Sequence, residues 1–326
     1  MLKSTKFQHI AKFQKSDLFI SIRQLLITLI PYFTIWYLMW LLLPISYLLT
    51  LLLSVLGAGF MVRIFIIFHD CTHGAFFKSQ SANNWLGRVL GVLLFTPYRA
   101  WQHEHAEHHA TASDLDHRGV GDIWTMTVNE YKQASKWTRF VYRLFRNPIV
   151  LFGVGPTWLF LVRNRLYNST MYRREKVSTI LTNIAILWWV LLLSVVLGFK
   201  NYLLIQLPIL AIASSLGVWL FYVQHQFEGV YWDRAETWDY TKSALDGSSF
   251  YKLPRWLQWF TGSIGFHHVH HLSPKIPNYY LEQCHEANPE LKKIKPITFW
   301  MSLKVMSFKL WDEDRKCLVG FDAVKD

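Results

Sequence analysis

Long apolar runs alternate with long polar segments along this chain. The four runs are Leu25–Leu43, Ile45–Phe68, Ile180–Phe199 and Tyr202–Val223. Each run has about the 20 residues that an α-helix needs to cross a bilayer. Only Pro44 separates the first two runs, and only Lys200 and Asn201 separate the last two. The pattern therefore predicts four transmembrane helices in two hairpins, each of which returns the chain to the side it came from.

The predicted spans divide the chain into five segments. Two pieces of the middle segment, Val89–Tyr98 and Pro148–Val162, are apolar but short for a span, and we expect them to be interfacial or buried helices. The first segment is basic and amphipathic, and no small-residue cleavage site marks it as a signal peptide. The segments are a cytosolic basic arm (1–24), a first transmembrane hairpin (25–68), a cytosolic or interfacial segment (69–177), a second transmembrane hairpin (178–223) and a cytosolic C-terminal segment (224–326).

Composition and charge agree with a membrane protein. The chain is 52% hydrophobic and 17% aromatic, which is more apolar surface than a soluble domain of this size would hide. All but two of its 34 Lys and Arg residues lie in the three segments outside the hairpins; the exceptions are Arg63 and Lys200. This asymmetry places those segments in the cytosol. Arg63 would be costly at mid-membrane unless it reaches the interface or faces the protein interior.

Histidines recur at helical spacing in the polar segments. On an α-helix, offsets of 0, 3 and 4 residues lie on one narrow face, so we expect the imidazoles of each cluster to point at one spot. Neutral imidazoles gathered at one place are typical metal ligands. The clusters are His69 and His73; His105, His108 and His109; and His267, His270 and His271. Eight imidazoles are too many for one ion.

A ninth candidate ligand, His225, lies outside these clusters. It follows the fourth apolar run as closely as His69 follows the second, so the paired hairpins would deliver both residues to the same depth. Nine imidazoles suffice for two metal ions, with positions left for water or dioxygen. We expect Glu228, three residues on, to orient the His225 ring. Further residues expected to support the ligands are Asp70, His103 and His268.

The three clusters resemble the histidine boxes of the integral-membrane fatty acid desaturases. That family carries H-x(3,4)-H, H-x(2,3)-H-H and H-x(2,3)-H-H, which match His69–His73, His105–His109 and His267–His271. Their order, their spacing relative to the hairpins and nearly the whole chain length agree with the family. Similarity is closest to the Bacillus-type acyl-lipid desaturases, through His108–Asp116, Gly119–Thr125, Gln224–Glu228 and His271–Tyr279.

The resemblance implies an all-α membrane protein whose four transmembrane helices lie under a helical cytosolic cap that holds a di-metal site. It implies two Fe²⁺ ions, and a reaction in which an acyl chain, dioxygen, two electrons and two protons give a cis double bond and two waters. The acyl chain would be lipid-linked, and the enzyme would lie in a bacterial cytoplasmic membrane with both termini and the active site cytosolic. The choice of iron rests on the resemblance, because imidazole also suits zinc.

The electron donor implied by the resemblance is a separate protein. The chain holds no four-cysteine cluster for an iron–sulfur centre and no His-Pro-Gly-Gly segment of a fused cytochrome b5 domain. A net charge of +12 suits an acidic ferredoxin or flavodoxin and anionic lipid headgroups.

Two alternatives remain open at the level of the sequence. Hydroxylases and other monooxygenases of the same superfamily share the histidine boxes, and spacing does not separate them from desaturases. A metal transporter is a function of a different class. Transporters place polar ligands near the bilayer midplane in broken helices, whereas here the histidines lie at the ends of spans and in cytosolic segments, which argues against transport.

Overall fold

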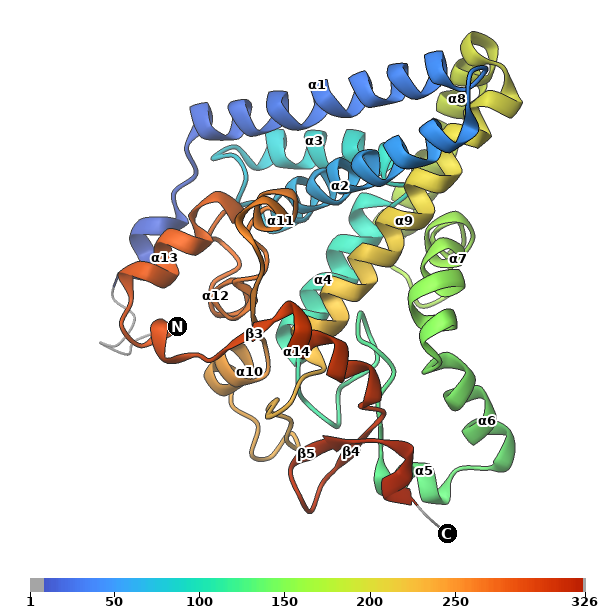
Figure 1. Cartoon of the computed structure of the whole chain (residues 1–326). Coiled ribbons are helices and arrows are strands. Elements are labelled where there is room, and N and C mark those ends of the chain that lie inside the picture. The colour runs from blue at the N-terminus through green and yellow to red at the C-terminus, as the bar shows by residue number, and fades with distance from the viewer. Residues whose placement is uncertain (1–8, 325–326) are drawn as a thin grey trace.

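The computed structural model describes residues 9–324, and among these residues four helices are long and apolar enough to cross a membrane. They are α1 (Leu18–Leu42), α2 (Tyr47–Thr72), α8 (Arg173–Leu197) and α9 (Phe199–His225). They form two hairpins whose turns lie at one end of the molecule (Figure 1). The predicted helical architecture with four spanning helices is confirmed. Residues 1–8 of the predicted basic arm lie outside the described residues.

Capping groups, not the edges of the apolar runs, decide where two of these helices begin. α1 starts seven residues before the predicted Leu25, where Asp17 Oδ1 accepts a hydrogen bond from Ile20 N at 2.9 Å. α8 starts before the predicted Ile180, where the Glu175 carboxylate accepts a hydrogen bond from Tyr172 N. The second hairpin turns at Gly198, whose φ of 85° favours glycine, and not at Lys200 and Asn201 as predicted.

The remaining elements are short. One predicted apolar piece, Pro148–Val162, contains a π-type turn (Val150–Val154) and α7 (Gly155–Leu161). The other, Val89–Tyr98, is interrupted where α3 (Gln80–Leu93) ends. The helices are α3 (Gln80–Leu93), α4 (Tyr98–Thr111), α5 (Val128–Gln133), α6 (Lys136–Phe145), α7 (Gly155–Leu161), α10 (Tyr240–Asp246), α11 (Arg255–Phe260), α12 (His267–Leu272), α13 (Leu281–Ala287) and α14 (Phe299–Lys304).

The described residues also form five short strands, which the sequence did not predict and which join distant parts of the chain. β1 (Met126–Thr127) runs parallel to β4 (Leu310–Asp312), which pairs with β5 (Cys317–Val319) in the antiparallel sense. β2 (Phe250–Lys252) runs parallel to β3 (Pro296–Thr298). The first sheet thus links the middle polar segment to the C-terminal segment.

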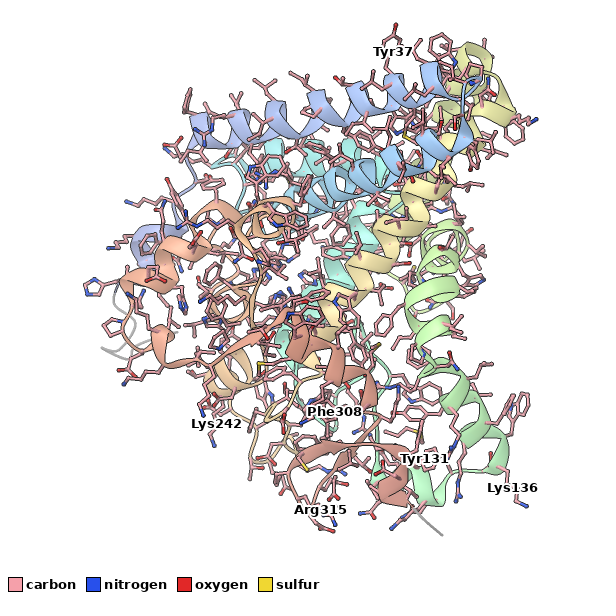
Figure 2. The ribbon with its side chains drawn as sticks, viewed as in Figure 1. Tyr37, Tyr131, Lys136, Lys242, Phe308 and Arg315 are labelled. Carbon is pink, nitrogen blue, oxygen red and sulfur yellow. The ribbon has the colours of Figure 1, made fainter. Side chains whose placement is uncertain are left out.

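Most of these elements form a cap at the end of the molecule away from the hairpin turns, whereas α3 lies along α2 and α7 lies along α9 (Figure 1). Ile10, near the start of the described chain, packs with Leu281 and Cys284 of α13 in one apolar cluster. Gln14 Nε2 donates a hydrogen bond to Ser273 Oγ at 2.9 Å. Figure 2 shows charged side chains of the cap, such as Lys242, at the end away from Tyr37 of α1. The start and the end of the described chain therefore lie on the same side of the four long helices.

Arg63 is a charged residue inside α2, and it faces the protein interior. Its Nε donates a hydrogen bond to Thr28 Oγ1 at 3.1 Å, and its Nη1 donates to the backbone carbonyl of Trp259. The guanidinium also lies 4.1 Å from the centre of the Trp259 ring, a cation–π contact. Arg63 thus joins α1 and α2 to α11, which belongs to the cap.

Arg146 is a second buried arginine, and it lies inside the cap with 1% of its surface exposed. Its Nη2 lies 2.9 to 3.1 Å from Tyr222 Oη, Gln226 Oε1 and Phe308 O, and its Nη1 lies 3.2 Å from Trp124 O. These partners are neutral oxygens from the loop before β1, the end of α9 and the segment before β4. One guanidinium therefore holds three distant segments together.

We predict that Arg146→Met destabilises the protein by about 3 kcal/mol, because it leaves several buried acceptors without a donor. The midpoint of thermal unfolding in detergent measures the effect. Arg315→Met is the control, since the Arg315 side chain is 71% exposed, and its midpoint should stay within about a degree of wild type. A wild-type midpoint for Arg146→Met would show that the three segments are held together by other contacts.

Candidate metal centre

Nine histidines from four helices meet where α2 and α9 enter the cap. His69 lies in the last turn of α2, His73 directly follows that helix, and His225 is the last residue of α9. Eight of the nine are buried and His73 is half-buried. The remaining six lie on α4 (His105, His108 and His109) and on α12 (His267, His270 and His271).

The ring nitrogens form two groups. Within each group, one nitrogen from each residue lies within 4.8 Å of the others. The five-histidine group comprises His69, His73, His105, His109 and His270, and the four-histidine group comprises His108, His225, His267 and His271. The structure thus brings together all nine candidate ligands predicted from the sequence, including His225.

The two clusters of three histidines are each shared between the two groups, whereas His69 and His73 both belong to the five-histidine group. On α4, His105 and His109 belong to the five-histidine group, whereas His108 belongs to the four-histidine group; on α12 the middle residue, His270, is the one that joins the five-histidine group. The expectation that each cluster points at one spot is therefore wrong for the two clusters of three histidines, although it agrees with the positions of His69 and His73. Consecutive residues are about 100° apart around a helix. The side chains of adjacent histidines, such as His108 and His109, therefore point in directions different enough to serve two groups.

The contacts between rings fit a bound cation. His225 Nδ1 lies 3.3 Å from Gly247 O, and His108 Nδ1 lies 2.6 Å from Asp122 Oδ1. In the neutral form of each ring, these acceptors favour the tautomer that carries its proton on Nδ1. The two Nε2 atoms, which are 3.1 Å apart, are then both without a proton. Lone pairs that face each other at this distance repel, and a metal ion between the rings would remove the repulsion.

The charge state of the rings also suits metal binding. Burial lowers the pKa of six histidines well below its ordinary value, and neighbouring imidazoles lower it further. These residues are His73, His105, His109, His267, His270 and His271. They are neutral at pH 7, which is the form that binds metals. The Nε2 atoms of His73 and His271 are buried and have no hydrogen-bond partner among the described residues.

Asp70, predicted to support the ligands, lies against a candidate ligand. His69 Nδ1 is 3.3 Å from Asp70 Oδ1. The other carboxylate oxygen accepts hydrogen bonds from Asn278 N at 2.7 Å and Asn278 Nδ2 at 2.8 Å. The carboxylate is held from the 3₁₀ helix directly before α13 (Asn278–Tyr280), so it can fix both the tautomer and the orientation of the His69 ring.

Asp122, which sequence reasoning missed, has the same role at the four-histidine group through its 2.6 Å contact with His108. The loop approaches α4 closely at Gly121, where φ is 69° and an added Cβ would lie 2.9 Å from Glu104 O. A side chain at 121 would push Asp122 away. Fourteen residues and no regular spacing separate Asp122 from His108, so only the Gly119–Thr125 resemblance pointed to this segment.

The predicted role of Glu228 is corrected by the structure. Its carboxylate lies 2.9 Å from Lys304 Nζ and is exposed to solvent. The His225 ring is held instead by the carbonyl of Gly247. α9 ends at His225, so the three-residue spacing to Glu228 is not helical and does not bring the two side chains together.

His103 and His268 also pair away from the two groups. His103 Nδ1 lies 3.8 Å from the carboxylates of Glu107 and Glu175. His268 Nε2 lies 3.0 Å from Nδ1 of His285 in α13. These contacts contribute to the packing of α4 and α12. None of them is made to the ring of a candidate ligand.

Comparison with known proteins shows which family this chain belongs to. A sequence model of the fatty acid desaturase family matches residues 40–301. The chain is 52% identical over 318 residues to a fatty acid desaturase of Bacillus subtilis, covering 98% of this chain and 90% of that protein. It is 28% identical over 266 residues to an sn-1 oleoyl-lipid 12-desaturase of Synechocystis sp., covering 80% and 72%.

A second Synechocystis protein, an sn-1 acyl-lipid omega-3 desaturase (ferredoxin), is 28% identical over 253 residues, covering 72% of this chain and 64% of that protein. The residues matched by the family model include both histidine groups, the end of α1 and all of α2, α8 and α9. The alignment with the Bacillus subtilis protein covers 98% of this chain. The chain therefore belongs to the fatty acid desaturase family and is an oxidoreductase of the desaturase type.

Proposed function

We propose that this desaturase introduces a cis double bond into the acyl chain of a membrane lipid, using dioxygen and two external electrons, with two iron ions held by the nine histidines. The division of buried histidines into groups of five and four carries this proposal. Zinc has no accessible redox change, whereas iron has one and binds imidazole. Two bound iron ions would supply the redox chemistry needed to break an unactivated C–H bond.

The chain's own residues would prepare this centre in three ways. The five-histidine and four-histidine groups would each hold one ion, with fewer protein donors at the second. Asp70 and Asp122 would fix the rings of His69 and His108. Burial of the rings excludes bulk water, which protects reactive species from side reactions.

The substrate and the electron donor are proposed from position, charge and relatives. The two groups lie at the ends of α2 and α9, where these helices leave the membrane, so an acyl chain of a lipid in that leaflet can reach them. The similar Synechocystis proteins are named for acyl-lipid or oleoyl-lipid substrates, and one for ferredoxin. A net charge of +12 suits an acidic ferredoxin or flavodoxin.

We further propose that the enzyme lies in a bacterial cytoplasmic membrane with its termini and the metal centre on the cytosolic side. Two observations support this orientation. The start and end of the described chain lie on the same side as the cap. Apart from Arg63 and Lys200, the lysines and arginines all lie in segments that this topology places in the cytosol.

Product analysis by mass spectrometry tests the proposed function directly. Membranes that contain the wild-type protein and a donor should yield lipids that have lost two hydrogen atoms, and purified protein should hold about two irons per chain, one for each group. His270→Ala and His108→Ala, one from each group, should both abolish the product while membrane insertion is retained, because insertion depends on the apolar helices. Lipids that gain an oxygen atom would identify a hydroxylase instead.

We predict that His225→Ala binds less iron than wild type and loses activity as fully as a variant of the three boxes. The reason is that His225 Nε2 lies 2.9 Å from His267 Nε2 and 3.1 Å from His108 Nε2, inside the four-histidine group. His117→Ala is the matched control, because the His117 side chain is 62% exposed. Full iron content with near-normal turnover in His225→Ala would show that His225 is not a ligand.

We predict that Asp122→Asn lowers iron affinity or activity by about 10- to 100-fold, because the amide no longer holds the His108 ring as a carboxylate does. The rate of iron loss to a chelator measures affinity without turnover. Asp314→Asn, at an exposed position of the cap, should lose iron at the wild-type rate. If Asp122→Asn also keeps that rate, the carboxylate does not support the ligand.

A further inference from the structure

A small cavity with a volume of about 60 Å³ lies between α1 and α8, in the membrane-spanning part of the molecule. Phe33 of α1 and Trp189 of α8 both line it, and their ring centres are 6.5 Å apart. Gln206 of α9 and Leu93, the last residue of α3, also line the cavity. Because Phe33 is 41% exposed, this side of the cavity borders the lipid that surrounds the helices.

Two of the side chains that line the cavity carry N–H groups without a partner. Gln206 is 3% exposed and Trp36 is 7% exposed. Neither Gln206 Nε2 nor Trp36 Nε1 forms a hydrogen bond with any described residue, and the same holds for the hydroxyl of Tyr202, whose ring contacts Trp36. Inside the membrane no bulk water replaces a missing partner, so leaving such groups unpaired is costly. Three unpaired polar groups in one place indicate that a polar ligand completes them.

Other buried polar side chains of the long helices are paired within their own helix. The hydroxyls of Thr28, Ser54 and Ser214 each donate a hydrogen bond to a backbone carbonyl three or four residues earlier. The amide of Gln206 makes no such bond and extends to the cavity wall. A polar residue in a membrane helix is costly, and at Gln206 no contact with the described residues offsets that cost.

The depth of these groups in the membrane indicates which molecule can reach them. Gln206 lies seven residues after the first residue of α9, and Trp36 lies six residues before the last residue of α1. Each is therefore about 9 to 11 Å from the end of its helix at the hairpin turns. α9 is about 40 Å long, whereas the hydrocarbon core of a bilayer is about 30 Å thick. The unpaired groups thus lie about 5 Å inside the edge of the hydrocarbon core, close to the ester carbonyls of glycerolipids.

The lining of the cavity also favours an ester group. An N–H group needs an acceptor oxygen, and the aromatic and aliphatic walls need apolar carbon beside that oxygen. The ester of a glycerolipid supplies both, because its acyl chain begins at the carbonyl carbon. A water molecule would find few further partners, since most of the lining is aromatic or aliphatic.

We propose that the cavity between α1 and α8 binds an ester carbonyl of a glycerolipid from the leaflet at the hairpin turns, with Gln206 Nε2 as the main donor. This lipid is a structural ligand and not the substrate, because Gln206 lies 19 residues before His225, which is about 28 Å along α9. The lipid bridges the two hairpins, since α1 belongs to the first and α8 and α9 belong to the second. It stabilises the protein, as does any ligand that binds only the folded state.

Two lipids that differ only in the carbonyl test the proposal. Wild-type protein in detergent is titrated with dimyristoyl phosphatidylglycerol or with its diether counterpart, and the midpoint of thermal unfolding is followed. We expect the diester to reach half of its full effect at about a tenfold lower concentration, which corresponds to one hydrogen bond. Gln206→Leu should remove this difference. Ser215→Ala is the matched control and should keep it, because the Ser215 hydroxyl donates to Ala211 O in its own helix.

The lipid-free protein gives an independent readout. Gln206→Leu and Gln206→Met each replace a buried unpaired amide by an apolar side chain of similar size. After removal of bound lipid by detergent exchange, the thermal midpoints of both variants should equal or exceed that of wild type. Lower midpoints in both variants would show that Gln206 already has a partner within the protein, and the proposal would be overturned.

Two further outcomes would contradict the proposal. If wild type responds equally to the diester and the diether, the cavity holds water or a hydrocarbon chain alone. If the preference for the diester persists in Gln206→Leu, that preference arises elsewhere, for example where the substrate lipid binds near the metal centre. Neither outcome bears on desaturation, which is measured separately as the loss of two hydrogen atoms from the lipid.

Discussion

The rest of the structure depends on one arrangement, in which the ring nitrogens of nine imidazoles converge inside the protein. Their lone pairs repel unless cations lie between them, and their burial removes water as a partner. No single helix supplies either group: each one draws on α4 and α12 and on the end of a long helix. The two hairpins and the cap must therefore hold fixed relative positions for either group to exist.

Two buried arginines help to hold the hairpins and the cap in these positions, and neither arginine is paired with a carboxylate. Arg63 binds a hydroxyl and a backbone carbonyl, and Arg146 binds hydroxyl, amide and carbonyl oxygens. Neutral acceptors allow one guanidinium to serve several segments at once, because its donors point in fixed and different directions. Arg63 joins the cap to the membrane helices, while Arg146 joins the end of α9 to the loop that carries Asp122. Both therefore act on the geometry of the metal centre from a distance.

The sequence predicted the four spans and the nine candidate ligands because both follow from spacing along one helix or run. It did not predict how the clusters divide, since the direction of His108 relative to His109 matters only once a second helix is placed beside α4. Asp122 was missed for the same reason: its contact with His108 is made by a loop. Glu228 was assigned a partner on the assumption that helical spacing continued, but α9 ends at His225. Helical periodicity can be recognised in the sequence, whereas contacts between separate elements cannot.

The order of the ligands along the chain separates the two groups in time. Four of the five donors in the five-histidine group lie before residue 110, whereas the four-histidine group has only His108 before the second hairpin. During synthesis from the N-terminus, the second group cannot assemble until both hairpins have crossed the membrane and α12 has left the ribosome. The two histidine groups are therefore unequal during synthesis: a chain that ended between α4 and α8 would contain four of the five donors of the five-histidine group and only His108 of the other.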